Sequence, residues 1–300
     1  MPLITTRSAA SARGLGFCQQ TGPRTQPISG YELWLDSSDA SKFTYSSGSV
    51  VSTWTDKSTN AYVFEQPTTA SAPTRTGTQN SKSTIVFDGS NDFLNSTAAT
   101  SVWKFLSDGT QSTVIVVYKN TRVPTGLQDE NVLLDTTGYE FPTVNAGYPG
   151  FTLQTDEDFF SSAYQTQTRA RVTSGVIASG QSSPATISNS ASILAANHNT
   201  WNVNINLLDV NNATSSNRLL AYNSQSSTPD SATTSSSVTY GWTAANTGSP
   251  ASTLKIGWEK SGGYYPPFKG EIAEIVMYKR KLSQAEVFEM RTYLKDKWNI

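Results

Sequence analysis

The sequence contains a single cysteine, Cys18, and a single histidine, His198. One cysteine cannot form a disulfide within the chain, and one histidine cannot build a zinc site from several imidazoles. A Ser-His-Asp triad would have to use His198, but no GxSxG motif accompanies it. The chain also lacks the GxGxxG, GxxxxGK[ST] and HExxH motifs. We therefore expect a turn or surface role for His198, and no enzyme of these classes.

Charge is also scarce, since charged residues make up 15% of the chain and the net charge is −1. A near-neutral chain lacks the positive field that captures nucleic acid or anionic membranes, and it associates readily with neighbours. No apolar run reaches the length of a membrane span, and the N-terminus has no apolar stretch typical of a signal peptide. The sequence therefore predicts synthesis in a reducing cytosol, no membrane insertion and no nucleic-acid partner.

Residues 1–29 differ in composition from the rest of the chain. They contain Arg7, Arg13, Phe17 and Arg24 but no carboxylate before Glu32, and they show no sustained hydrophobic period. Such a segment is typical of an extended arm. Two interpretations remain open, a disordered tail and an anchoring arm that becomes ordered against a partner. We predict the second, with the folded domain spanning residues 30–300.

Short segments with alternating or continuous apolar residues, separated by turn residues, follow from residue 31 onward. This spacing is typical of an antiparallel β-sandwich. We expect strands at 31–35, 50–54, 83–87, 112–119, 131–135, 150–154, 170–178, 201–210, 217–223, 237–242, 253–258 and 271–279. The stretches 179–192 and 224–237, which are rich in Ser and Thr, are predicted to be loops.

One helix is predicted at the C-terminus. Ser283 and Glu286 have the spacing of a capping box, and Leu282 is placed to pack on Val287 as a hydrophobic staple. Apolar residues then recur at helical spacing up to Trp298. The sequence therefore predicts an all-β fold, an antiparallel sandwich of the jelly-roll type, closed by one C-terminal α-helix and preceded by the arm.

The segment GGYYPPFKG places Tyr264, Tyr265 and Phe268 in a loop rich in Gly and Pro. Flat aromatic rings match the apolar faces of sugars, and a short loop cannot easily bury three of them. These residues are the candidate contacts for a glycan or a partner. The alternative is a loop folded over the edge of the sandwich or against a sister subunit.

The segment FDGSNDFL offers Asp88, Asn91 and Asp92 as oxygen donors on a tight turn. Calcium takes such ligands, although the spacing is not that of an EF-hand. The favoured interpretation is a hairpin whose side chains cap their own backbone, so that no cofactor is required.

Paired carboxylates would suit a glycosidase. The sequence offers the run 156–158, Glu259, and the pair Glu271 and Glu274. Because Glu271 and Glu274 are three residues apart, they are predicted to point to opposite faces of a regular strand. We therefore expect no enzymatic activity, and keep a glycoside hydrolase or lyase as the alternative from another functional class.

Several segments resemble the concanavalin A-like, laminin-G-like jelly-roll family. YELWLDSSDAS and VVSTWTDKSTNAY resemble its first strands, and IVFDGSNDFL resembles its FDGxNDyL hairpin. TWNVNINLLDV with NRLLAYN, and the closing segment LKIGW to RTYL, also match. The closing match places Gly270, Glu271, Ile272, Glu274, Tyr278, Leu282, Ser283 and Glu286 on the family pattern. The resemblance implies a lectin-like fold, often carbohydrate-binding and in some members calcium-binding.

The segment TTRSAASARGLGF resembles an AASARGFGF-like segment of tailed-phage virion proteins. The two resemblances together imply a phage structural protein located in the virion. The expected function is that of a tail fibre or surface adhesin, anchored to other virion proteins through residues 1–29 and attaching to host polysaccharide. It is expected to be a homo-oligomer, with a trimer as one option. A capsid decoration protein without glycan binding is the alternative.

Overall fold

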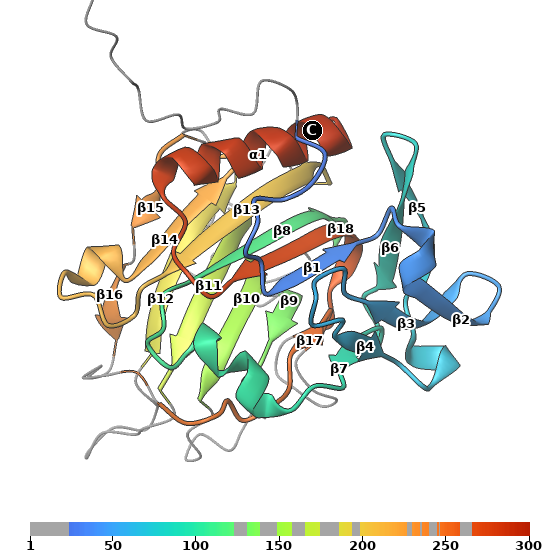
Figure 1. The fold of residues 1–300 in the computed structure, drawn as a ribbon, viewed down its shortest axis with the longest axis horizontal. Coiled ribbons are helices and arrows are strands. Elements are labelled where there is room, and N and C mark those ends of the chain that lie inside the picture. The colour runs from blue at the N-terminus through green and yellow to red at the C-terminus, as the bar shows by residue number, and fades with distance from the viewer. Residues whose placement is uncertain are drawn as a thin grey trace, which may run out of the picture.

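A computed structural model describes residues 24–122, 131–138, 149–157, 166–174, 186–193, 199–226, 230–234, 236–239, 245, 247–258 and 266–300. The predicted fold class is confirmed, with antiparallel strands and one C-terminal helix (Figure 1). The strands are β1 (Leu33–Asp36), β2 (Phe43–Ser47), β3 (Val50–Thr55), β4 (Val63–Glu65), β5 (Thr74–Gln79), β6 (Lys82–Asp88), β7 (Leu94–Ser96), β8 (Ser112–Asn120), β9 (Asn131–Asp135), β10 (Gly150–Glu157), β11 (Thr166–Thr173), β12 (Thr186–Ile193), β13 (Trp201–Leu208), β14 (Leu219–Asn223), β15 (Thr233–Thr234), β16 (Ser236–Thr239), β17 (Lys255–Ile256) and β18 (Lys269–Tyr278). The helix is α1 (Gln284–Trp298).

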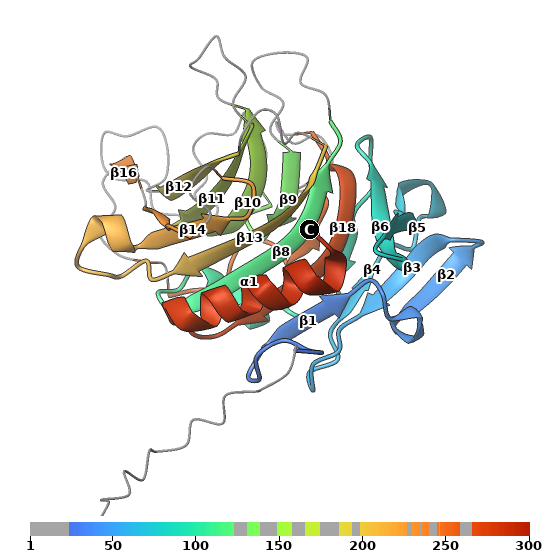
Figure 2. The same ribbon diagram turned by 90° about the horizontal axis from the view of Figure 1, so that it is seen from above.

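The strands are hydrogen-bonded into one continuous sheet that folds over on itself to give two layers. The first layer places β1, β18, β8, β13 and β14 side by side. The second places β17, β9, β10, β11, β12 and β16 side by side. The short strands β2 to β7 join the layers at one end, since β6 pairs with β18 and β7 with β17. The helix α1 lies along the outer face of the first layer (Figure 2).

Strand β8 shows why the molecule has two hydrophobic cores. Val114, Val116 and Tyr118 point into the core between the two layers, whereas Ile115 and Val117 belong to the core beneath α1. Successive side chains of a strand point to opposite faces, so a strand covered on both sides must be apolar at nearly every position. The nearly continuous apolar run at 112–119 is therefore the sequence of a strand covered on both faces.

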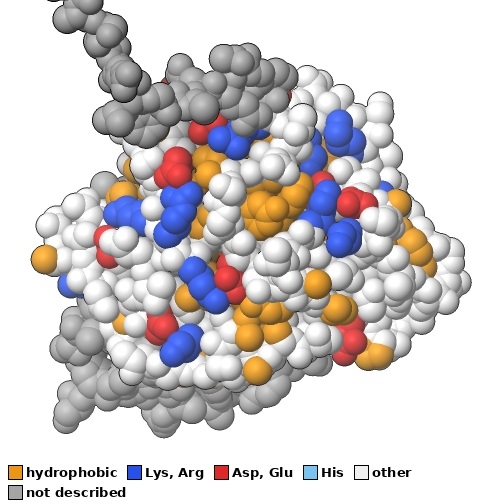
Figure 3. All heavy atoms as spheres, in the orientation of Figure 1, with side chains coloured by type: hydrophobic (Ala, Val, Ile, Leu, Met, Phe, Trp, Pro, Cys, Tyr) orange, Lys and Arg blue, Asp and Glu red, His pale blue; other side chains and the backbone are white. Residues whose placement is uncertain are grey.

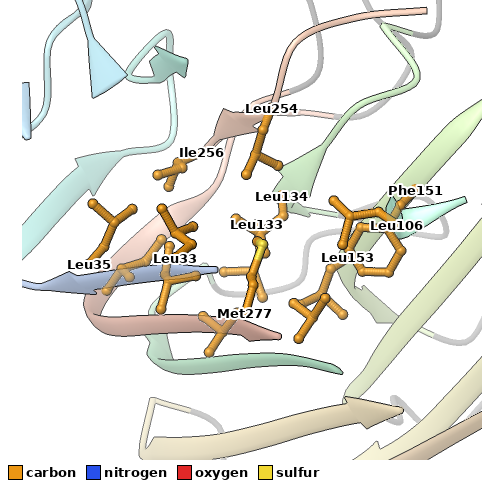
Figure 4. Packing of buried hydrophobic residues seen from close by; sticks show 14 of the residues in the cluster. Leu33, Leu35, Leu106, Leu133, Leu134, Phe151, Leu153, Leu254, Ile256 and Met277 are labelled. Carbon is orange, nitrogen blue, oxygen red and sulfur yellow. The ribbon is translucent and has the colours of Figure 1, made fainter. Parts of the chain in front are cut away.

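The core between the layers is formed by residues far apart in the sequence. Leu33, Leu133, Leu153 and Met277 pack together there, and Leu106, from the 3₁₀ segment Thr100–Leu106, lies beside the same group (Figure 4). All five side chains are almost completely buried. Burial of this apolar surface is the main stabilising contribution to such a fold.

Helix α1 has the predicted capping box. The Ser283 Oγ accepts the backbone N–H of Glu286, and the Glu286 carboxylate accepts the backbone N–H of Ser283. Val287, Leu294 and Trp298 are fully buried against the first layer. No helix among the described residues is long and apolar enough to span a bilayer.

Strand β13 carries polar side chains on its inner face. Trp201, Val203, Ile205 and Leu207 pack under α1, while Asn202, Asn204 and Asn206 alternate with them toward the second layer and are buried. The amide of Asn206 donates to Asn204, and that of Asn202 donates to the Tyr118 hydroxyl. The interior between the layers is therefore hydrogen-bonded, and not only apolar, at its β13 end.

Several strands were not predicted. The stretch 186–193, predicted to be part of a loop, forms β12, and β15 lies within the other predicted loop. The short strands β2, β4, β5 and β7 were also missed. All of these segments except β4 are rich in Ser, Thr, Gly or Asn and lack a strong apolar alternation, whereas β4 is only three residues long. Their pairing partners therefore determine their conformation.

Residues 24–29 of the predicted arm lie on the sandwich of their own chain. The Arg24 side chain forms an ion pair with Glu289 on α1. Ile28 is buried, and its carbonyl oxygen accepts a hydrogen bond of 2.9 Å from the Tyr278 hydroxyl. Arg24, predicted to bind a partner, is thus paired internally, because the helix presents a carboxylate beside it. The candidate arm residues Arg7, Arg13 and Phe17 lie outside the described residues.

Candidate functional site

The predicted aromatic site is corrected at Phe268. This side chain is fully buried, with its ring 5.9 Å from that of Phe87 and 6.3 Å from that of Tyr118, so it is a core residue and not a glycan contact. Its backbone N–H donates to the carbonyl of Gly257, which aligns the chain for β18 immediately after the two prolines. Phe268 and Ile272 are four residues apart in an extended segment, so they share one face, and this spacing could have predicted that Phe268 is buried. Tyr264 and Tyr265 lie outside the described residues.

The turn after β6 has the contacts of a self-capped hairpin. Asp88 Oδ1 accepts the backbone N–H of Ser90, and Asp92 Oδ2 accepts that of Asp88 at 2.9 Å. Asn91 donates its amide to Ser71 Oγ. No cluster of three His, Cys, Asp or Glu side chains suited to a metal ion occurs in the described ranges. Side-chain oxygens of Asp88 and Asp92 thus accept backbone N–H groups of their own turn, as the hairpin interpretation predicts.

Asp92 should make the stability of the protein depend on pH. Burial raises the pKa of Asp92 to about 6, so this carboxyl stabilises the fold when protonated, and that contribution is lost as the pH rises through 6. Asn at this position keeps an acceptor for the Asp88 N–H. We expect Asp92→Asn to gain about 1–2 kcal/mol relative to the wild type between pH 4 and 7. Urea unfolding across this range measures the gain, and parallel pH profiles for the two proteins would contradict it.

The two carboxylates of β18 share one face, and the prediction of opposite faces is wrong. Glu271 is opposite Lys119 and Glu274 is opposite Val117, so the register shifts by one residue between Ile272 and Glu274. This β-bulge adds one residue to the strand and returns Glu274 to the side that carries α1. Glu271 forms an ion pair of 2.5 Å with Lys119.

Glu274 is nevertheless inaccessible to a substrate. Its side chain is completely buried beneath α1 and accepts hydrogen bonds from Trp34 Nε1 at 2.7 Å, Tyr293 OH at 3.2 Å and Trp298 Nε1 at 2.8 Å. Lys297 Nζ lies 2.7 Å from its second oxygen. Burial raises the pKa of Glu274. This carboxylate therefore anchors the end of the helix and leaves no position for a sugar beside it.

A groove of about 690 Å³ opens at the other end of α1, where the start of the helix meets β13 and β14. Its apolar lining comprises Leu207, Leu220, Tyr222 and Leu282, which belong to the core beneath the helix or pack against it. The Tyr222 ring stands perpendicular to that of Phe288, at a centroid distance of 6.3 Å. We call these residues and the polar side chains around them the α1 groove. It is the candidate binding site.

Glu286 lies on the rim of the α1 groove as a permanent anion. Its carboxylate oxygens accept hydrogen bonds of 2.7 and 2.9 Å from the Arg280 guanidinium. Hydrogen bonding from Arg280, helped by the backbone and side chain of Ser283, lowers the pKa of Glu286 to about 2, against the opposing effect of burial. This carboxylate is therefore charged and paired over the whole working pH range.

The other two charged residues of the groove are also paired. Asp230, at the tip of the turn before β15, forms an ion pair with Arg291 of α1. Lys281 Nζ lies 3.5 Å from Asp209 Oδ2. Positive and negative side chains also lie beside one another over much of the visible face of the molecule (Figure 3). The described residues of the groove therefore present no cluster of positive charge.

Uncharged polar groups in the groove remain available. Gln111, Ser231 and Gln284 line the groove and are solvent-exposed. Neither these side chains nor the Tyr222 hydroxyl form a hydrogen bond within the part of the chain that the structure describes. Amide and hydroxyl groups both donate and accept hydrogen bonds, as the hydroxyls of a sugar require.

The sequence did not reveal the α1 groove. Its residues come from the position just before β8, from β13 and β14, from the turn before β15 and from the segment around the start of α1, so no local motif contains them. One signal was present in the sequence. Leu220 and Tyr222 alternate on β14, and their side chains lie on the same face of the sheet as the helix-facing residues of β13.

No family model matches the sequence, and no curated protein matches it. Solved structures do resemble the fold. Trypanosoma rangeli sialidase in complex with sialic acid aligns at a TM-score of 0.50 and 15% identity, covering 90% of this chain and 34% of that one. The botulinum neurotoxin serotype D binding domain aligns at 0.52 and 10% identity, covering 89% and 51%. This chain thus spans about a third of the sialidase and half of the neurotoxin domain, and the likeness shows the fold alone.

Proposed function

We propose that this protein is a lectin-like module that binds glycans in the α1 groove and catalyses no reaction. The observation that carries the proposal is an open groove with an apolar floor, the aromatic ring of Tyr222, and several amide and hydroxyl groups that make no hydrogen bond to another described residue. Sugar recognition needs this combination, because apolar sugar faces pack on rings while the hydroxyls need hydrogen-bond partners.

Two further observations support this function. The fold is shared with a sialidase and with a neurotoxin binding domain. Of the carboxylates that the sequence offered for hydrolysis, Glu274 is sealed beneath the helix and Glu271 is paired with Lys119. A non-catalytic binding role fits these contacts better than a glycoside hydrolase does.

Blocking the α1 groove should abolish glycan binding. Ser231 is exposed on the groove rim, so Ser231→Trp places a large ring across the opening without entering the core. We expect glycan affinity on an array of host polysaccharides to fall at least about 100-fold, which corresponds to nearly 3 kcal/mol. The control is Ser46→Trp on β2, which is also exposed and does not line the groove. Equal affinity of the two variants would contradict the proposed site.

We further propose that the module is a virion component, a tail fibre or surface adhesin, held by its N-terminal arm. The proposal is supported by the acid-free composition of the arm, by the low charge of the chain and by the resemblance of TTRSAASARGLGF to phage virion segments. Residues 24–29 are fixed on the sandwich, which leaves residues 1–23 to engage neighbouring virion proteins. Many copies, as a homo-oligomer or on one particle, would multiply a weak affinity for each glycan.

Deleting residues 2–23 should leave a folded domain that fails to join particles. The deletion spares the contacts of Arg24 and Ile28, so the unfolding temperature should change little. Incorporation into particles is measured by immunoblotting of purified virions, and normal incorporation would refute the anchoring role. A full-length protein that joins particles but binds no glycan would instead support the decoration-protein alternative.

A further inference from the structure

We propose that the α1 groove selects neutral glycans and discriminates against sialylated or sulfated ones. This inference rests on the proposed glycan-binding function and names the ligand class of that site. It follows from the difference between the charged and the uncharged groups that line the groove.

The charged groups of the groove are committed to partners in the same chain. Asp230 is paired with Arg291, Lys281 lies 3.5 Å from Asp209, and Glu286 accepts two hydrogen bonds from Arg280. A ligand that engaged any of them would have to compete with an existing ion pair.

An acidic ligand would meet unfavourable electrostatics. Among the lining residues that the structure describes are two carboxylates, Asp230 and Glu286, and one cation, Lys281, which already faces a carboxylate. An anionic group held here loses hydration without gaining an unpaired cation from these described residues, and it lies near like charges. Protein sites for carboxylate or sulfate usually offer an unpaired Arg or Lys.

A neutral ligand finds free partners. The side chains of Gln111, Ser231 and Gln284 and the Tyr222 hydroxyl surround the apolar floor without hydrogen bonds to other described residues. Each amide offers both a donor and an acceptor, which matches the hydroxyl and N-acetyl groups of neutral sugars. The floor of Leu207 and Leu220 suits an apolar sugar face.

The experiment compares the full chain on matched glycan pairs that are identical except for a terminal sialic acid or sulfate. We expect the neutral member of each pair to bind at least about 10-fold more tightly, which is 1.4 kcal/mol. Its affinity should change less than about twofold between 0.05 and 0.5 M salt, because no charge pairing contributes to it.

Two variants locate the preference. Gln284→Ala should weaken neutral binding by about 3- to 10-fold, as expected for the loss of one or two hydrogen bonds. Asp296→Ala, at an exposed position near the C-terminal end of α1 and outside the groove lining, should change it by less than about twofold. Equal or tighter binding of the acidic members would overturn the inference and leave the proposed function standing. Absence of binding to every glycan would overturn both.

Discussion

Replacing Glu274 by alanine should lower the free energy of unfolding by about 3–5 kcal/mol. The substitution removes the acceptor shared by Trp34, Tyr293 and Trp298 and leaves Lys297 with a single carboxylate partner, Asp36, beneath the helix. Buried donors that lose their acceptor retain the full cost of their desolvation. Because this carboxylate connects β1, β18 and the last turn of α1, its removal should lower the stability of the whole domain.

The matched control is Glu289→Ala on the same helix. Glu289 also forms an ion pair, but its side chain is 43% exposed, and exposed pairs contribute about 0–1 kcal/mol. Chemical denaturation followed by tryptophan fluorescence measures both variants, and circular dichroism confirms that they fold. If Glu274→Ala were no more destabilising than Glu289→Ala, the carboxylate would not be the anchor of the helix.

The predictable parts of the fold are those where local sequence and tertiary contacts agree. The capping box of Ser283 and Glu286 defines the start of α1, and the apolar run 112–119 identifies a strand buried on both faces. In each case one short window contains the whole signal. The strand at 186–193 does not, because Ser and Asn have weak strand preference and pairing with β11 determines its conformation.

The site was less predictable, for two physical reasons. A β-bulge interrupts the two-residue periodicity of β18, so counting residues from Glu271 could not predict the side of the sheet to which Glu274 points. The α1 groove is built by non-local contacts, since Gln111 and Gln284 are far apart in the sequence and neither belongs to a motif. The aromatic residue predicted from composition, Phe268, is buried because strand alternation outweighs its place beside a Gly- and Pro-rich loop.

Gly270→Ala should be as damaging as the loss of Glu274, with an expected cost of about 3 kcal/mol or more. Gly270 pairs with Asn120 of β8, and the Phe268 ring folds back over it in the core. A Cβ added there would lie 2.1 Å from the carbonyl oxygen of Lys119 and 2.6 Å from the Phe268 ring. The first contact is with the backbone, so relieving it requires the paired strands β8 and β18 to separate.

The control separates steric from conformational cost. Gly48, in the turn between β2 and β3, has φ +54° and no heavy atom within 4 Å of an added Cβ. Gly48→Ala should therefore lower the free energy of unfolding by only about 1 kcal/mol, which is the cost of placing alanine in the left-handed conformation. Thermal unfolding of both variants gives the comparison. If Gly270→Ala were as stable as Gly48→Ala, β8 and β18 could separate at little cost. The missing side chain of Gly270 would then not be required for the packing of the Phe268 ring in the core.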